Sequence, residues 1–283
     1  MTSLTQLTKE ILKHRGASPK KYFSQNFLVD RGVYDSIIQA GNVSEDDYVI
    51  EIGPGLGFLT SELTKTAGQV VAVEIDRDLA AGLADMEAIS DNLAIVNEDI
   101  MEIDLEDLPN FTKDVDYKVI ANIPYHLTSK IFKLFLARNH RPTRMVLLVQ
   151  KEVAERVIAT TGDHTRLSLS VQLYSRPKII RTVSKSSFYP QPKVDSAVLM
   201  MEIDDSYINR LNNEKLFWQI VRIVFTGKRK KIINTLTNSL EHDKDYFLER
   251  LKQCSIDPSS RPQHLSIDQW IDFVNLLNSD KEF

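Results

Sequence analysis

A glycine-rich turn directly after a short apolar run constrains the fold of this chain more than any other feature. The run covers residues 48–52, and the turn reads GPGLG from Gly53 to Gly57. Glycine tolerates positive φ and lets a ligand approach the backbone closely. A strand that ends in such a turn and continues into a helix is typical of parallel α/β sheets, whose ligands bind at the carboxyl ends of the strands.

Apolar runs and helical patterns alternate up to about residue 205. Helical patterns at 58–66 and 79–89 separate the first runs, which predicts crossover connections, a mostly parallel sheet and helices on both of its faces. Two later runs predict antiparallel strands at the sheet edge. The expected strands are 48–52, 69–75, 93–97, 117–121 and 145–149, with 167–173 and 197–203 at the edge.

Beyond residue 205 the spacing of apolar residues becomes helical. Phe217, Ile220, Val221 and Val224 recur at the spacing of one helix face. Ser266 is a suitable N-cap for a last helix. The pattern predicts an α/β domain at 1–205 and a small helical domain at 206–283.

Composition excludes several classes of protein. No apolar run is long enough to span a membrane, and the N-terminus lacks the apolar region of a secretory signal. The single Cys254 excludes an internal disulfide framework and a zinc site built on several cysteines, and the histidines show no metal-ligand spacing. We therefore expect a cytoplasmic protein that binds neither a membrane nor a metal.

Charge is distributed unevenly, although the net charge is only −4. Residues 43–118 carry 4 basic and 19 acidic side chains, whereas residues 126–193 carry 13 basic and 3 acidic ones. This asymmetry predicts one surface that faces a polyanion. Basic residues that only coat solvated helices would give the same counts.

Acidic residues around the glycine turn suggest its ligand. Glu51 precedes the turn, where a carboxylate would repel a diphosphate but suit an ammonium or sulfonium group. Glu74 and Asp76 end the second strand, where an acid can bind ribose hydroxyls. Asp99, after the third strand, can accept a hydrogen bond from an adenine amine. Together they predict a site for S-adenosylmethionine, although each alone would also fit a tight turn or a solvated strand end.

The segment Asn122-Ile123-Pro124-Tyr125 follows the fourth strand and so belongs to the same sheet edge. The Asn122 oxygen and a nearby carbonyl can accept both N–H groups of an exocyclic adenine amine, which favours a pyramidal nitrogen. Pro124 fixes the backbone, and Tyr125 offers a face on which a base can stack. We predict methyl transfer to adenine N6 by positioning and electrostatics. The plainer alternative is a proline turn with a half-buried tyrosine.

In this order, these residues resemble the ribosomal RNA adenine N6-dimethyltransferase family, which includes the KsgA (RsmA) and Erm enzymes. The resemblance runs from about residue 20 to about residue 272, and the segments 188–198 and 225–236 resemble the KsgA branch. It implies a Rossmann-like class I S-adenosylmethionine-dependent methyltransferase fold with a small C-terminal all-α domain.

The resemblance also implies roles for individual residues. The catalytic contacts would be Asn122, Tyr125 and Phe188, whose ring would face the target base. The cofactor contacts would be Gln25, Asn26, Leu28, Gly53, Gly55, Glu74, Asp99, Ile100 and Asn122. A basic cluster at an expected helix start would bind RNA phosphates without reading sequence, unless it is only a solvated helix face. That cluster is Arg222, Lys228, Arg229, Lys230 and Lys231.

The implied reaction is dimethylation of two adjacent adenosines in a hairpin loop near the 3′ end of small-subunit (16S) rRNA. It would act during ribosome biogenesis, with the immature 30S subunit as partner of a monomeric enzyme and S-adenosyl-L-homocysteine as product. An Erm-type enzyme acting on 23S rRNA is the first alternative, because His126 occurs at its position in some Erm proteins. The sequence pattern also leaves open a DNA adenine methyltransferase, a ribosome-assembly factor whose catalysis is secondary, and a small-molecule methyltransferase.

Overall fold

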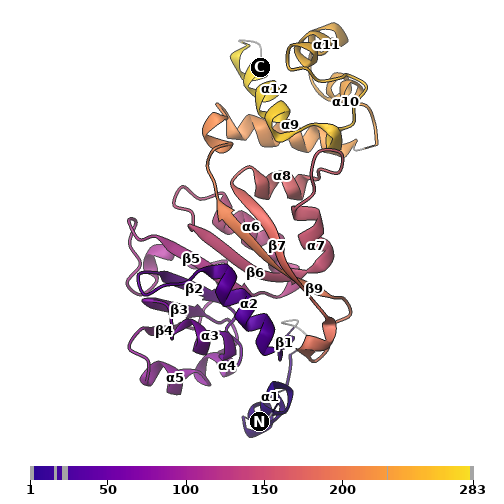
Figure 1. The fold of residues 1–283 in the computed structure, drawn as a ribbon. Coiled ribbons are helices and arrows are strands. Elements are labelled where there is room, and N and C mark those ends of the chain that lie inside the picture. The colour runs from indigo at the N-terminus through magenta and orange to yellow at the C-terminus, as the bar shows by residue number, and fades with distance from the viewer. Residues whose placement is uncertain (1–2, 16–17, 21–24, 228, 281–283) are drawn as a thin grey trace. The chain divides into compact units, whose positions relative to one another are not determined.

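The computed structural model describes residues 3–15, 18–20, 25–227 and 229–280 (Figure 1). The chain forms two compact units. The first comprises Met1–Ala154 and Pro177–Ile203, and the second comprises Glu155–Arg176 and Asp204–Phe283. The segment 155–176, which the sequence boundary at residue 205 assigns to the α/β domain, thus groups with the C-terminal helices. None of the helices in the described ranges is long and apolar enough to cross a membrane.

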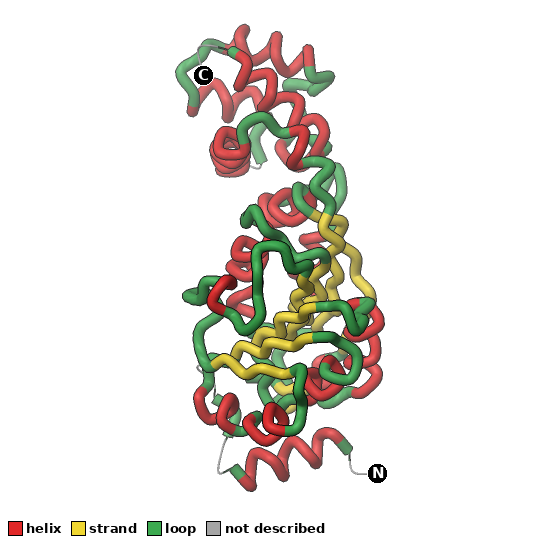
Figure 2. Tube along the Cα trace, turned by 90° about the vertical axis from the view of Figure 1, so that its left-hand side faces the viewer, coloured by secondary structure: helices red, strands yellow, loops and turns green. Residues whose placement is uncertain are grey.

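The first unit is built on a seven-stranded sheet with helices on both faces (Figure 2). Strands β2, β3, β4, β5 and β6 pair in parallel and β9 pairs antiparallel to β6, which confirms the expected parallel strands and the late antiparallel strand at 197–203. Across the sheet the strands are β4 (Leu93–Val96), β3 (Gln69–Val73), β2 (Tyr48–Ile52), β5 (Tyr117–Asn122), β6 (Arg144–Gln150), β9 (Ser196–Ile203) and β7 (Ser175–Val183).

Strand order reverses between β2 and β5. From β2 the chain passes outward to β3 and β4 on one side, and then returns to add β5 and β6 on the other. At such a reversal the connecting loops diverge and leave a crevice beyond the carboxyl ends of the strands. All five residues of β2 are buried, including Glu51, because helices cover both sides of a parallel sheet.

Helices of the first unit connect and cover these strands. Helix α2 contacts β5, β6 and β9, α3 contacts β3, and α2 also contacts α3, so these two helices share one face. Figure 1 draws α2 in front of the sheet and α6 behind it. The helices are α1 (Leu4–His14), α2 (Arg31–Gly41), α3 (Phe58–Leu63), α4 (Arg77–Ala81), α5 (Ala84–Ala88) and α6 (Thr128–Leu136), and α7 (Lys151–Val157) leads into the second unit.

The helix expected at 79–89 is two short helices instead. Helix α4 ends at Gly82, which is its C-cap, and α5 begins at Ala84. Glycine is a poor residue for a helix interior and a common one where a helix ends. The apolar spacing continued across this break, so the pattern alone predicted one helix.

A small two-stranded sheet joins the N-terminal segment to a distant loop. Strand β1 (Phe27–Leu28) pairs antiparallel with β8 (Phe188–Tyr189). The Val29 amide also donates to the Ser187 carbonyl at 2.8 Å. This pairing fixes the segment that carries Asn26 beside the main sheet.

The second unit contains five complete α-helices in its described part. They are α8 (Arg166–Gln172), α9 (Glu214–Thr226), α10 (Ile232–Ser239), α11 (Lys244–Gln253) and α12 (Ile267–Ser279). Ser266 caps α12 through a capping box with Gln269, as the sequence predicts.

The strand expected at 167–173 is wrong, because these residues form α8. Thr165 and Ser168 make a capping box that starts a helix, and this local signal outweighs the alternation of apolar residues. The true edge strand is β7, which the sequence did not predict. It begins Ser-Arg-Pro-Lys and is mostly exposed, a composition typical of an edge strand rather than a buried one.

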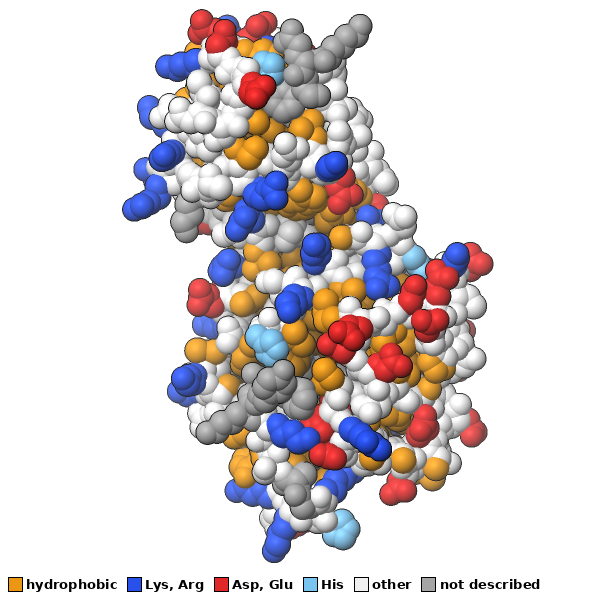
Figure 3. All heavy atoms as spheres, turned by 180° about the vertical axis from the view of Figure 1, so that it is seen from behind, with side chains coloured by type: hydrophobic (Ala, Val, Ile, Leu, Met, Phe, Trp, Pro, Cys, Tyr) orange, Lys and Arg blue, Asp and Glu red, His pale blue; other side chains and the backbone are white. Residues whose placement is uncertain are grey.

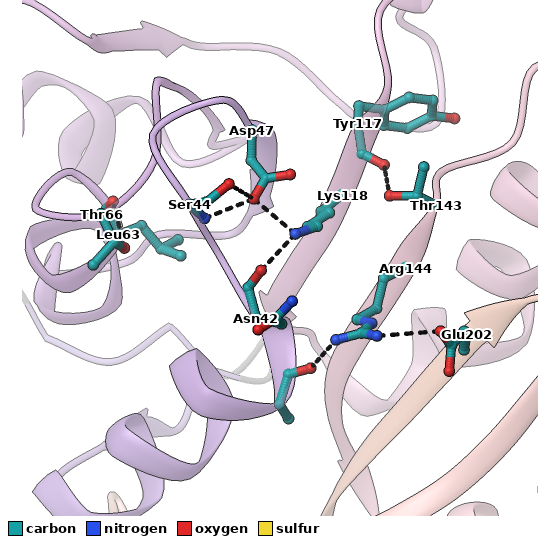
Figure 4. A network of polar contacts seen from close by, with 11 residues as sticks. Asn42, Ser44, Asp47, Leu63, Thr66, Tyr117, Lys118, Thr143, Arg144 and Glu202 are labelled. Atoms are coloured by element: carbon teal, nitrogen blue, oxygen red, sulfur yellow. Dashed lines mark hydrogen bonds and ion pairs between the residues drawn. The ribbon is translucent and has the colours of Figure 1, made fainter.

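Polar contacts fasten the amino end of the sheet, opposite the crevice (Figure 4). The Lys118 ammonium donates to the Asn42 carbonyl at 2.6 Å and pairs with Asp47 at 2.7 Å. Arg144 donates to a main-chain carbonyl near the end of α2 at 3.2 Å and pairs with Glu202 at 3.3 Å. Both cations are largely covered, and together they join α2 to β5, β6 and β9.

Candidate active site

The crevice at the strand reversal contains a cavity of about 450 Å³. Its wall is formed by the segment before β1, the glycine turn after β2, the ends of β3 and β5, and the loop after β4. All these segments belong to the first unit. Every predicted cofactor contact lines this cavity: Gln25, Asn26, Leu28, Gly53, Gly55, Glu74, Asp99, Ile100 and Asn122.

The glycine turn has the left-handed backbone that its sequence predicts. Gly53, Gly55 and Gly57 have φ of 66°, 60° and 84°. A Cβ on Gly57 would lie 2.7 Å from the Leu83 and Met86 side chains, so that position requires glycine on two grounds. Gly57 is also the N-cap residue of α3, so the turn directs the start of this helix toward the cavity.

Of the two acids after β3, only Glu74 lines the cavity. Its carboxylate accepts the Gly55 amide at 3.1 Å and the Asp76 amide at 2.9 Å, which fixes its position against the turn. Asp76 instead binds Lys20 at 2.8 Å and the Gln25 amide at 2.9 Å. Burial by itself would raise the pKa of Asp76, but these two hydrogen bonds lower it.

The side chain of Gln25 therefore connects the segment before β1 to Asp76 at the end of β3. Its Nε2 donates to Asp76 and its Oε1 accepts the Lys20 amide at 2.8 Å. Both ends of the amide group are thus engaged within the protein, although the residue lines the cavity. Lys20 also pairs with Asp78 at 2.8 Å, so the segment before β1 is held to the end of β3.

Glu51 is a buried acid in the cavity wall. The residue is 1% exposed, and its Oε2 has no hydrogen-bond partner among the described residues. Burial, together with the nearby charge of Glu74, raises the pKa of this carboxyl to about 8. A buried charge needs a partner, so the wall offers an ionisable oxygen to a cationic group in the cavity.

Two isoleucines line the cavity together with Asp99. Ile100 is buried and Ile75 is 48% exposed. The Asp99 carboxylate accepts the Met101 amide at 2.9 Å, which holds it in place. Sequence reasoning missed Ile75. The available signal was an isoleucine between two acids at the end of a strand, where an apolar side chain has no core to enter.

The end of β5 forms the side of the cavity that the sequence predicts to bind the methyl acceptor. Asn122 is the last residue of β5, and its Nδ2 donates to the Asn26 carbonyl at 3.4 Å, which leaves its amide oxygen as an acceptor. Tyr125 also lines the cavity, and its hydroxyl lies 2.7 Å from the Ser196 hydroxyl. Burial raises the pKa of Tyr125, so this phenol stays neutral.

Phe188 does not line the cavity. Its side chain is 4% exposed and belongs to the hydrophobic core with Leu28, its partner in the small sheet. Its stacking on a target base stays a prediction, while Tyr125 is the aromatic side chain that this structure brings to the Asn122 side of the cavity.

The basic cluster lies in the second unit. Arg222 is exposed on α9, and Arg229, Lys230 and Lys231 are exposed in the turn before α10. Lys228 lies outside the described residues. Helix α10 begins at Ile232 with Lys231 as its N-cap, so the basic run precedes this helix rather than forming its first turn.

Some basic side chains of the segment 126–193 are engaged within the protein, so the basic surface of the first unit is smaller than the composition suggests. Arg141 donates to the Leu136 carbonyl and Arg144 is engaged at the amino end of the sheet. Lys130 and Lys133 remain exposed on α6, and Lys130 lines the cavity. Acidic side chains gather instead on the side of this unit that carries β3 and β4, at the right of Figure 3.

The fold and this cavity define a class of protein. The strand order with its reversal, the left-handed glycine turn and the acids at the strand ends are those of Rossmann-like class I methyltransferases that use S-adenosylmethionine. Within the part of the chain that the structure describes, no group of three His, Cys, Asp or Glu side chains could hold a metal ion.

The chain belongs to the ribosomal RNA adenine dimethylase family, whose model matches residues 16–279. It is 38% identical over 268 residues to ribosomal RNA small subunit methyltransferase A of Dehalococcoides mccartyi (strain CBDB1), covering 95% of this chain and 91% of that protein.

Two solved structures are similar over most of their length. A dimethyladenosine transferase from Plasmodium falciparum has a TM-score of 0.75 and 27% identity, covering 89% of this chain and 97% of that one. The 23S rRNA methyltransferase ErmE has a TM-score of 0.72 and 25% identity, covering 90% and 100%. The family predicted from the sequence is thereby confirmed, and the protein is an S-adenosylmethionine-dependent rRNA adenine dimethyltransferase.

Proposed function

We propose that this protein dimethylates the N6 amines of two adjacent adenosines in the 3′-terminal hairpin of small-subunit (16S) rRNA. The observation that carries the proposal is that Glu51, Glu74 and Asn122 line the same cavity. The relative that is named a small subunit methyltransferase supports this choice of RNA. The similarity to ErmE makes large-subunit rRNA the alternative.

The cavity wall suits each part of the donor. Glu74 would bind the ribose hydroxyls and Asp99 the adenine amine, and Ile75 and Ile100, which also line the cavity, would contact the ring. Glu51 would balance the cationic end of the donor. Asn26 and Leu28 would close over it from the segment before β1, and Gly53 and Gly55 would allow the close approach.

The donor supplies an electrophilic methyl group on a sulfonium. The Asn122 oxygen and the Ile123 carbonyl would accept the two N–H groups of the adenine amine, so that its lone pair points at the methyl carbon. Tyr125 would stack on the base and hold it in that plane. The new N–CH₃ bond forms as the S–CH₃ bond breaks, and the resulting ammonium then loses a proton to water. Positioning and electrostatics would supply most of the acceleration.

Basic side chains would hold the RNA. The exposed Arg222, Arg229, Lys230 and Lys231 would neutralise phosphates, as would Lys228, and Lys130 and Lys133 would do so beside the cavity. We propose the immature 30S subunit as the partner, a monomer as the active form and the cytoplasm as the place of assembly.

Transfer of tritiated methyl groups from S-adenosylmethionine to unmethylated small subunits tests this function. Digestion to nucleosides should place the label in N6,N6-dimethyladenosine, with two modified adenosines for each subunit at completion. Large subunits in a parallel reaction are the control. Label that enters only the large subunit supports the Erm-type alternative, and an absence of labelled adenosine in both subunits contradicts the proposal.

A further inference from the structure

A buried serine holds the aromatic residue of the acceptor site. The Tyr125 and Ser196 hydroxyls are 2.7 Å apart, although the residues are 71 positions apart in the chain. Ser196 is fully buried and lies outside the cavity lining, whereas Tyr125 is half-buried and lines it. Any effect of Ser196 on a bound base must therefore pass through the tyrosine ring.

Sheet topology explains why this serine reaches the site. Ser196 is the first residue of β9 and pairs with Gln150, the last residue of β6. Because β9 is antiparallel to β6, its beginning lies at the edge where the parallel strands end. A serine there faces the loop after β5 without contributing to the cavity wall.

The tyrosine is held at both ends. At its backbone, the Tyr125 carbonyl accepts the Thr128 hydroxyl at 3.0 Å, at the start of α6. At the tip of the ring, the phenol is bonded to Ser196. Without the second bond the ring could turn about its side-chain torsions, and a base stacked on it would move with it.

We propose that Ser196 is a positioning residue for methyl transfer, because its hydroxyl fixes the Tyr125 ring that aligns the acceptor base with the methyl donor. The inference rests on the proposed function and goes beyond it, since it concerns a side chain outside the cavity. It also gives a reason for tyrosine rather than phenylalanine at position 125.

A double-mutant cycle tests the proposal. Ser196→Ala and Tyr125→Phe each remove the same bond and keep the stacking ring, so each should lower kcat by roughly three- to tenfold. The double variant should be no slower than the slower single variant. Affinity for S-adenosylmethionine, measured by calorimetry, should be unchanged in all three variants, because the bond lies on the acceptor side.

Two matched controls separate positioning from general stability. Ser175→Ala removes another fully buried serine hydroxyl, which donates to the Val171 carbonyl at 2.8 Å. Tyr48→Phe removes another tyrosine hydroxyl, which donates to the Pro109 carbonyl at 2.7 Å. Both should keep the wild-type kcat even where they lower the melting temperature.

The outcomes distinguish this inference from the function on which it rests. Wild-type kcat in either single variant, or losses that multiply in the double variant, would overturn the positioning role while wild-type methylation still stands. An inactive wild-type enzyme would remove both. If Ser196→Ala does not fold, Tyr125→Phe removes the same bond from the half-buried side. Comparison of its kcat with that of the control Tyr48→Phe then decides the question.

Discussion

Among single residues, Glu51 links the stability of the protein to its binding chemistry. Its carboxyl is buried with one oxygen unpartnered among the described residues, and its pKa is raised to about 8. In the unfolded chain the pKa returns to its ordinary value near 4.3. The folded state therefore favours the protonated form, and a cation in the cavity would favour the ionised one.

Glu51→Gln should change the pH dependence of stability. In the wild type, the contribution of the Glu51 carboxyl to stability is fully present below about pH 4 and is lost as the pH rises toward 8, because the folded state retains a proton that the unfolded state releases. The glutamine variant lacks this loss, so at pH 9 it should gain on the order of 3–5 kcal/mol relative to wild type, with no gain at pH 4. Urea unfolding at several pH values measures the difference.

Glu45→Gln, at an exposed position, is the control for that comparison. The same Glu51→Gln variant should bind S-adenosylmethionine roughly tenfold more weakly, since it offers no charge to the cationic donor. Parallel pH profiles for the two variants would contradict the assignment of Glu51.

Asn122 is the residue that we propose orients the acceptor nitrogen. Asn122→Ala should lower kcat by about a hundredfold or more, which is typical when one preorganised polar group is removed. Binding of S-adenosylmethionine should fall much less, as Glu74 and Asp99 remain. Single-turnover methyl transfer checks the prediction, and a loss below threefold would exclude the proposed hydrogen bonds from catalysis.

The sequence predicted the site residues that sit next to recognisable turns. The glycine turn, Glu74 and Asn122 each end a strand, so their order along the chain locates them. Two other contacts join segments that are far apart in the chain: the hydrogen bond between Tyr125 and Ser196, and the ion pair between Lys20 and Asp76. Such contacts depend on tertiary packing, which no local pattern records.

At the scale of elements, α6 begins beside the cavity and presents two cations. Lys130 and Lys133 are exposed three residues apart, which places them on one side of the helix. Two other basic residues of the segment 126–193, Arg141 and Arg144, bind carbonyls and Glu202 within the protein. Composition counted all four equally, and only the structure separates them.

Replacing both lysines by alanine should weaken rRNA binding and leave the binding of S-adenosylmethionine unchanged. KM for the RNA substrate should rise roughly tenfold, and the salt dependence of binding should become shallower by about one to two units of slope. Lys113→Ala, on the acidic half of the unit, is the control. An unchanged slope would show that α6 does not contact phosphates.

Strands and helices were predicted correctly where the burial of a segment agreed with the spacing of its apolar residues. The parallel strands β2, β3 and β6 are buried on both faces and read as nearly continuous apolar runs. The prediction failed at α8, where apolar residues alternate as in a strand but a capping box sets the helix. It also failed at β7, because the polar residues of an exposed edge resemble a loop.

For the whole molecule, the boundary at residue 205 divides a packed unit. Segment 155–176 precedes the last strands in sequence but packs with the C-terminal helices. Tyr174 donates to Glu214, and its main chain accepts the Asp204 amide at 3.0 Å. The Gly162 amide donates to the Gln263 carbonyl at 2.8 Å. A change of sequence pattern at one position could not reveal that the chain enters the second unit at 155–176 and returns to the first unit at 177–203.

A fragment ending at residue 205 should therefore be destabilised. It would expose Leu169, Val171 and Leu173, which are fully buried in the intact chain, and each buried aliphatic side chain contributes about 1.5–3 kcal/mol. Thermal unfolding of the fragment should begin well below that of the full chain, with dye binding to the exposed surface. An equal melting temperature would mean that 1–205 folds alone.

Direct titration of the purified protein with S-adenosylmethionine tests the central claim, that the cavity at the β2–β5 reversal is a methyl-donor site. Calorimetry should show saturable binding at one site per chain, at least tenfold weaker in Glu74→Ala because the ribose loses its acceptor. Absence of binding in the wild type, or equal affinity in the variant, would contradict the account.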